Sequence, residues 1–248
     1  MKTFTKGILI TAAIVLILGI VILFTAFALN GFKFKGLYQK EKYEKHEMEI
    51  KEDIKAINID EINGDIKFVI TEDDCHVEYY DSEKIVHEIS VDGDTLVIEQ
   101  KDNTKWYEYL RFNFGYENDN GVIIYIPKNE LREIKIESTN GDIEIKDLII
   151  SQALTADTTN GDITISNVKA GRTSFDTVNG DIKLTKLESL QNDFQTVNGD
   201  IKGTLVGRYK IDTDTVNGDV SVPKKTYGAD GRINAETVNG DIDLDWDT

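Results

Sequence analysis

The tripeptide Asn-Gly-Asp recurs through the second half of the chain at nearly constant spacing. After residue 134 it begins six times, at Asn140, Asn160, Asn179, Asn198, Asn217 and Asn239. A fixed period of about 20 residues indicates a stacked repeat architecture, because one such unit is too short to bury its own apolar face. A further copy begins at Asn63, and its distance from Asn140 is close to four more periods.

Aligning the copies on the asparagine shows which positions face a core. Apolar residues stand three and five positions after it and often four positions before it, as Ile163, Ile165 and Ala156 do around Asn160. The positions between them are mostly polar. Because positions of one parity share one face of a strand, each repeat predicts two short strands with a single buried face. In a stack of such coils, equivalent residues would lie about 4.8 Å apart and form ladders.

A β-meander of Asn-Gly hairpins is the alternative architecture, since Asn-Gly is also a common hairpin turn. A meander would place Val178 opposite Asp181 across the turn, an apolar side chain against a charge. A solenoid pairs like with like. The predicted fold class is therefore all-β, a β-helix-like solenoid with repeats of about 20 residues, preceded by one N-terminal transmembrane helix.

The corner residues have structural explanations. Asn tolerates the left-handed backbone region and Gly enters it freely, so we expect the pair to form a tight corner. Stacked carboxylates repel, so we expect each Asp either to bond a turn amide or to hold part of a row of cations. The candidate cation row is Asp142, Asp162, Asp181, Asp200, Asp219 and Asp241. The expected turn residues are the six asparagines above and Gly141, Gly161, Gly180, Gly199, Gly218 and Gly240.

An uncharged apolar run at positions 8–29 follows a short tail at positions 1–7. Its length suits an α-helix crossing a hydrocarbon core of about 30 Å, so we interpret it as a retained transmembrane helix. The alternative is a signal peptide cleaved after residues 26–28. Lysines flank the run on both sides, so their count does not decide the orientation. Because long domains cross regardless of flanking charge, we expect a single-pass protein of the cell membrane whose large C-terminal domain is extracytoplasmic.

Three further segments follow the hydrophobic run. Residues 30–55 are expected to form a polar stalk, and charges of alternating sign at helical spacing over 38–55 predict a solvated helix there. Residues 56–133 show period-2 alternation broken by turn residues, which predicts an N-terminal β segment of diverged repeats. The regular solenoid is expected over residues 134–248, with Trp246 covering the last coil.

Composition and motifs exclude several function classes. The chain has a net charge of −17, and beyond its N-terminal tail and apolar run it carries 45 acidic against 26 basic residues, a net of −19 that repels nucleic acid. The single cysteine, Cys75, excludes an internal disulfide and is expected to be a small core residue. No zinc-protease spacing, serine-hydrolase elbow, Walker loop or dinucleotide fingerprint is present. We therefore predict no enzyme activity, no catalytic residue and no cofactor.

The stretch VIIYIPK at residues 122–128, together with the reiterated TVNGDI, resembles the "putative adhesin" family of bacterial β-strand-repeat proteins, which includes LiaG-like envelope proteins. The resemblance covers residues 50–248. It implies a β-repeat fold at the cell envelope and supplies no catalytic residue. The expected function is a membrane-anchored, non-catalytic interaction or scaffold module that binds an envelope protein or a wall polymer. The alternatives are an accessory role in envelope-stress sensing and a polysaccharide-active β-helix enzyme.

Overall fold

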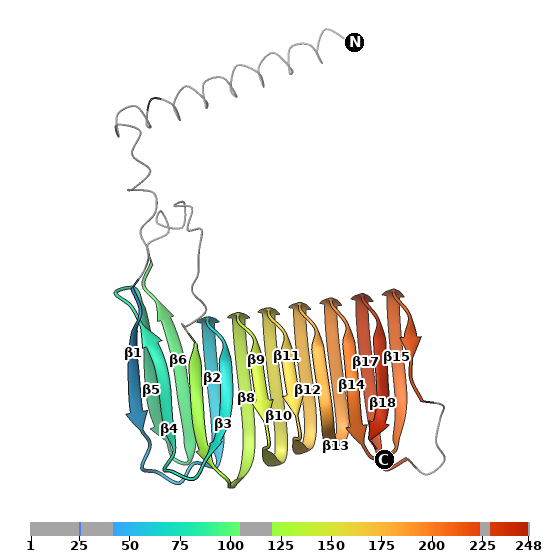
Figure 1. Cartoon of the computed structure of the whole chain (residues 1–248), viewed down its shortest axis with the longest axis horizontal. Coiled ribbons are helices and arrows are strands. Elements are labelled where there is room, and N and C mark those ends of the chain that lie inside the picture. Colours follow the sequence, from blue (N-terminus) through green and yellow to red (C-terminus); the bar gives the residue numbers. More distant parts are fainter. Residues whose placement is uncertain (1–24, 26–41, 105–120, 224–228, 248) are drawn as a thin grey trace. The chain divides into compact units, whose positions relative to one another are not determined.

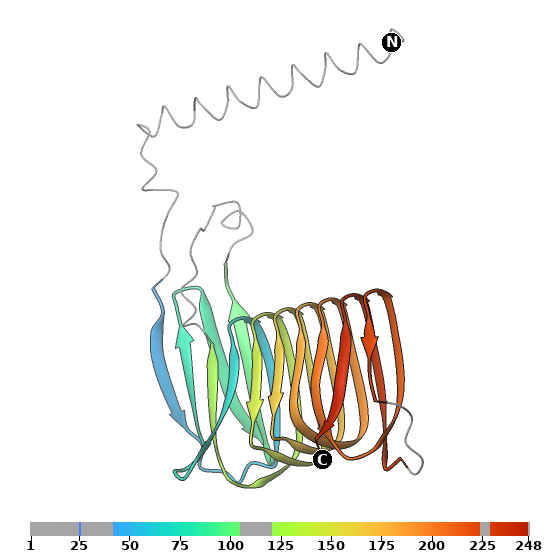
Figure 2. The same ribbon diagram turned by 45° about the vertical axis from the view of Figure 1, so that its right-hand side comes forward.

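The computed structural model describes residue 25 and residues 42–104, 121–223 and 229–247. Apart from Thr25, these residues contain strands, turns and bends and no helix. The strands lie in two sheets, A and B, whose inner faces enclose the core (Figures 1 and 2). The chain passes from one sheet to the other at each corner, so that successive coils stack along one axis.

Apart from its first two strands, sheet B consists of the strands that end at the Asn-Gly corner. Its pairing is parallel except between the first two strands, which form an antiparallel hairpin. In spatial order its strands are β5 (Ile85–Asp92), β6 (Thr95–Asp102), β2 (Ala56–Asn63), β8 (Glu130–Asn140), β10 (Ile149–Asn160), β12 (Lys169–Asn179), the second half of β13 (Ile182–Asn198), β17 (Gly231–Asn239) and β15 (Tyr209–Asn217).

Apart from its first three strands, sheet A consists of the strands that begin after that corner. Its first three strands pair antiparallel and the rest pair parallel. In spatial order its strands are β1 (Glu44–Glu49), β4 (His76–Asp81), β7 (Val122–Pro127), β3 (Ile66–Thr71), β9 (Ile143–Lys146), β11 (Ile163–Ser166), the first half of β13, β14 (Ile201–Val206), β18 (Ile242–Asp247) and β16 (Val220–Ser221).

Neighbouring coils pair like with like. Asn160 lies opposite Asn140 on one side and Asn179 on the other, and the strands that carry them run parallel. Parallel neighbours require a crossover between them, whereas a hairpin would make them antiparallel. The prediction of an all-β solenoid is confirmed, and the alternative of a meander built from Asn-Gly hairpins is wrong.

The coils do not stack in chain order at either end of the solenoid. The Asn63 coil pairs directly with the Asn140 coil. The described strands that lie between them in the sequence, β4 to β7, are not four intermediate coils but build the N-terminal end beyond the Asn63 coil. At the other end the last coil, β17 and β18, lies between the Asn198 coil and the Asn217 coil. Trp246 therefore belongs to a strand that is not the outermost one in its sheet, and its ring centroid lies 5.3 Å from that of Tyr209.

Ladders of apolar side chains fill the space between the two sheets. Positions three and five after the asparagine are buried in most coils, and the rings of Phe175 and Phe194 stack with their centroids 5.4 Å apart. Val220 is 44% exposed because its coil is the last in the stack. Cys75 is buried, as predicted, and burial raises the pKa of its thiol to about 11.

The predicted stalk helix is wrong where the structure describes it. Residues 44–49 form strand β1, which pairs antiparallel with β4. Lys45 forms an ion pair with Glu78, and the His46 ring stacks on Tyr79. An available sheet edge therefore outweighs the weak helical preference of an alternating charge pattern, whose i,i+4 pairs contribute only a few tenths of a kcal/mol each.

In the described residues we find no helix with both the length and the hydrophobicity that a membrane crossing requires. The predicted membrane segment, residues 8–29, lies outside these residues apart from Thr25.

Candidate functional site

The asparagines of the repeat form one continuous hydrogen-bond ladder. The side-chain Nδ2 of each donates to Oδ1 of the asparagine in the coil nearer the N-terminal end, over distances of 2.8–2.9 Å. The ladder runs from Asn63 to Asn217 and follows the spatial order of the coils, so Asn239 stands between Asn198 and Asn217. These residues hold the corners together and leave little side-chain capacity for a ligand.

The corner glycines are required for close approach of the coils. A Cβ built on Gly180 would lie 1.9 Å from the carbonyl oxygen of Gly161, a distance that no side chain tolerates. The expected left-handed backbone is absent from the Asn-Gly pairs. It occurs instead at the opposite corner, where Asp147, Asn167 and Lys186 have φ of 57°, 53° and 54°. The Asn-Gly pairs therefore turn the chain without a left-handed residue.

The aspartates of the repeat bond to backbone amides. The Oδ1 of each accepts the backbone N–H of the next aspartate in the stack, as between Asp181 Oδ1 and Asp200 N at 2.9 Å. Two lysines neutralise part of the row: Lys183 pairs with Asp162, and Lys202 pairs with Asp200. Nowhere in the described ranges do three or more His, Cys, Asp or Glu side chains converge as metal ligands, so the geometry gives no support to a cation row.

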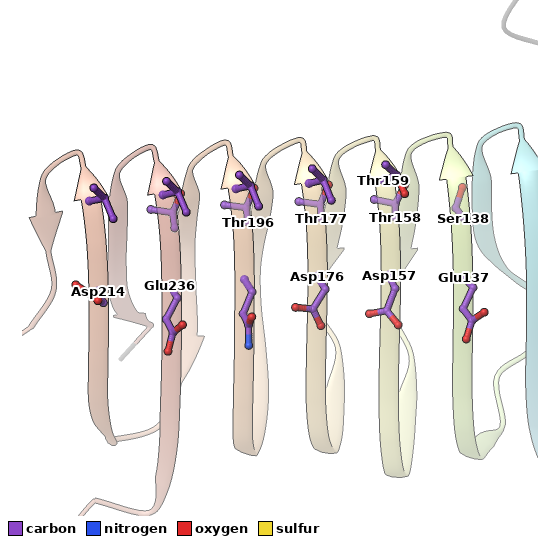
Figure 3. Close-up of a pocket in the computed structure, with 16 residues that line it drawn as sticks. Glu137, Ser138, Asp157, Thr158, Thr159, Asp176, Thr177, Thr196, Asp214 and Glu236 are labelled. Atoms are coloured by element: carbon purple, nitrogen blue, oxygen red, sulfur yellow. The ribbon is translucent and has the colours of Figure 1, made fainter.

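A second row of acids crosses the outer face of sheet B, three positions before each asparagine. We call it the outer row; in spatial order it is Glu137, Asp157, Asp176, Gln195, Glu236 and Asp214. Figure 3 shows its carboxylates following one another across the strands. Two positions further along the same strands lies the valine row: Val178, Val197, Val238 and Val216, exposed by 41%, 39%, 39% and 71%. Together the rows line a groove of about 620 Å³, the acidic groove.

Most carboxylates of the outer row have no cation beside them. Lys135 pairs with Glu137, but Asp157, Asp176, Glu236 and Asp214 make no ion pair with any residue that the structure describes. Partial burial, followed by the charges of neighbouring carboxylates, raises the pKa of Asp176 to about 6. Partial burial likewise raises the pKa of Asp157. By contrast, the Lys202 ammonium and the Asp241 amide lower the pKa of Asp200 in the corner row.

The outer row was not singled out from the sequence. Its signal was an acidic residue at the same offset in five of the six copies, which alignment on the asparagine shows as a polar position of the exposed face. Whether such a row is neutralised depends on which lysines face it. That is a property of the folded stack, because the coil order places Glu236 between Gln195 and Asp214.

A buried polar cluster lies near the N-terminal end of sheet B. His87 Nδ1 is 2.8 Å from Asp81 Oδ1, and His87 Nε2 is 3.1 Å from Glu61 Oε2. Gln100 Nε2 donates to the other oxygen of Glu61, which is fully buried. Burial by itself lowers the pKa of His87, but Glu61 and Asp81 outweigh it and leave this pKa raised. The cluster contains no Ser, Cys or Lys that could act as a nucleophile, and none of its members lines the acidic groove. We therefore assign it a role in stability.

Comparison with family models gives a match that spans residues 54–248 and carries the description Toastrack DUF4097. The chain belongs to the Toastrack DUF4097 family. This confirms the β-strand-repeat family that the sequence resembles. The match covers every coil of the solenoid, including the Asn63 coil and the acidic groove. No curated protein matches the chain.

Several solved structures are similar to this family member. A "putative cell adhesion protein" from Clostridium sporogenes is 14% identical, with 84% of this chain and 100% of that one covered and a TM-score of 0.42. A "putative adhesin" from Bacteroides fragilis is 16% identical, with 85% and 99% covered and a TM-score of 0.44. A "putative lipid binding protein" from Parabacteroides distasonis is 13% identical, with 85% and 99% covered and a TM-score of 0.34.

Proposed function

We propose that this protein is a non-catalytic interaction module of the cell envelope, which presents the acidic groove of sheet B to a partner. In this proposal the hydrophobic segment of residues 8–29 anchors the chain in the cell membrane, and the solenoid lies outside the cytoplasm. The groove is one continuous surface built from six coils, so its natural ligand is an elongated segment of a protein or a polymer.

The observation that carries the proposal is the contrast between the two acidic rows. The corner row is satisfied within the fold, by backbone amides and by Lys183 and Lys202. The outer row remains largely without cations. Its neighbouring acids, which lie on both sides of the neutral Gln195, stand about 4.8 Å apart, and each such pair repels by roughly 1 kcal/mol even in water. A partner that neutralised these carboxylates would relieve that repulsion.

The repetition of the outer row also bears on catalysis. An acidic side chain occupies the same position in five of the six coils. A repeated side chain in repeated surroundings suits an extended contact surface better than a single reacting centre.

Site-specific photo-crosslinking in intact cells tests this function. A photoreactive phenylalanine derivative would replace Val197 in the groove or, as a matched control, Thr164 on the outer face of sheet A. We expect a discrete adduct from position 197 and none from position 164. Equal adducts from both positions, or none from either, would contradict the proposal.

The location has its own test, with a peptide tag placed after Thr248. Protease added to intact cells should remove the tag, while a cytoplasmic marker stays intact. Protection of the tag until the cells are lysed would contradict an extracytoplasmic solenoid, provided that a wall-exposed control protein is digested in the same cells.

A further inference from the structure

The acidic groove has two parallel edges of different chemistry. The outer row and the valine row lie two residues apart on the same strands, so they are separated by about 6.7 Å. Both rows run across the strands, along the axis of the stack. A ligand that fills the groove must therefore present cations along one edge and, beside the four coils that carry the valine row, apolar groups along the other.

We propose that the acidic groove binds a basic amphipathic α-helix of a partner protein. This inference rests on the proposed function and names the chemistry of its partner. From Glu137 to Asp214 the outer row spans five inter-strand steps, or about 24 Å. A helix of about 16 residues has the same length.

The spacing of the rows favours a helix over an extended strand. A helix lying along the groove presents one turn every 5.4 Å or so, against about 4.8 Å between coils. The mismatch accumulates to about 3 Å over five steps, which long Lys and Arg side chains absorb. Side chains on one face of an extended strand repeat only every 6.7 Å or so, and the mismatch would then reach about 10 Å.

The negative charge of the groove favours a positively charged partner. Five of the residues lining the groove are Asp or Glu and none is Lys or Arg. Anionic lipid surfaces and nucleic acids are repelled by such a face, whereas a helix with Lys or Arg at i, i+3 and i+4 meets successive carboxylates. Leu or Val on the adjoining stripe of the helix would cover the valine row, as in other helix-in-groove complexes.

The test uses fluorescence anisotropy with the protein and two peptides of equal length, about 16 residues, and identical Lys and Leu content. One peptide places these residues at helical period, and the other alternates them at the period of a strand. We expect the helical peptide to bind and the alternating peptide to bind at least about tenfold more weakly. Tighter binding of the alternating peptide would overturn the helical geometry.

Two matched double variants test the site. Asp157→Asn with Asp176→Asn removes two charges from the groove, and Asp243→Asn with Asp245→Asn removes two exposed charges from β18 in sheet A. We expect the first pair to weaken binding of the helical peptide about tenfold or more and the second pair to change it less than about twofold. Equal weakening would mean non-specific attraction to an acidic protein and would overturn the site.

Failure of this inference can be told apart from failure of the proposed function. If neither peptide binds but Val197 still gives a discrete crosslink in cells, the groove is an interaction surface for a partner of other chemistry. That outcome overturns the helical partner alone. If the crosslink is absent as well, the interaction module itself is contradicted.

Discussion

At the residue scale, the corner glycine is the position most tightly constrained by the stack. From the sequence, Gly could be explained by turn geometry alone. In the structure its lack of a Cβ lets one coil's backbone contact the carbonyl of the next, and this contact repeats from Gly141 to Gly218. The difference could not be seen in one repeat, because it arises only when two coils are in register.

Gly180→Ala should therefore destabilise the protein strongly. The new Cβ would lie 1.9 Å from the Gly161 carbonyl oxygen, so the coils must separate. We expect the free energy of unfolding to fall by about 3 kcal/mol, the range of overpacked sites. Chemical denaturation monitored by circular dichroism measures it.

Gly93→Ala is the matched control for that experiment. Gly93 has φ of +65° but nothing within 4 Å of its Cβ position, so only backbone strain of about 1 kcal/mol is expected. If the two variants lost the same stability, conformational preference and not close approach would explain the corner glycines.

At the scale of elements, strand pairing determined the secondary structure of segments whose local sequence pattern was ambiguous. The buried positions of β10, β12 and β13 follow from period-2 alternation, and their stacking follows from the repeat. The strand β1 did not follow, because its charge pattern suits a helix in isolation and becomes a strand only against the edge of β4. The groove likewise could not be predicted from the sequence, because it depends on which strands are neighbours.

The buried polar cluster around His87 allows a separate test of stability. His87→Gln would leave the fully buried Glu61 without its cationic partner, and we expect the free energy of unfolding at pH 6 to fall by about 3 kcal/mol. Glu47→Gln, an exposed control on β1, should change it by less than about 0.5 kcal/mol. Denaturation of both variants in parallel checks this, and equal losses would contradict the role of the cluster.

The same cluster should make stability depend on pH. The pKa of His87 is raised in the folded state, so its contribution is present below the unfolded value of about 6.5 and is lost as the pH rises through the folded value. Burial also raises the pKa of Glu61, which has the same sign. Amide exchange, corrected for its intrinsic rate, should show the β5–β6 hairpin losing protection above neutral pH. Unchanged protection of that hairpin through the same range would contradict this.

At the scale of the whole molecule, the order of the coils departs from the order of the chain. A repeat of constant spacing predicts that the last coil in the chain ends the stack. Instead β17 is inserted between β13 and β15, and β2 between β6 and β8. Equivalent repeats carry equivalent sequences, so their pattern does not distinguish these orders.

A pair of engineered disulfides tests the coil order in a Cys75→Ala background. Gln195→Cys with Glu236→Cys joins residues that lie directly opposite each other in neighbouring strands, within the range of Cα distances that a disulfide spans. Gln195→Cys with Asp214→Cys joins residues two strands apart, about 9.6 Å. We expect rapid oxidation of the first pair only. Preferential oxidation of the second pair would show that the coils stack in chain order.

The central claim is that the protein carries two acidic rows, one satisfied by the fold and one left open on the outer face of sheet B. Carboxyl carbon NMR of aspartate-labelled protein tests it most directly, with Asp176→Asn and Asp200→Asn used to assign the signals. The account predicts that Asp176 titrates near pH 6 and that Asp200 titrates below its ordinary value of 3.8. If both carboxyls titrated together near 3.8, Asp176 would be neither partly desolvated nor repelled by its neighbouring carboxylates, and the account of the groove would be wrong.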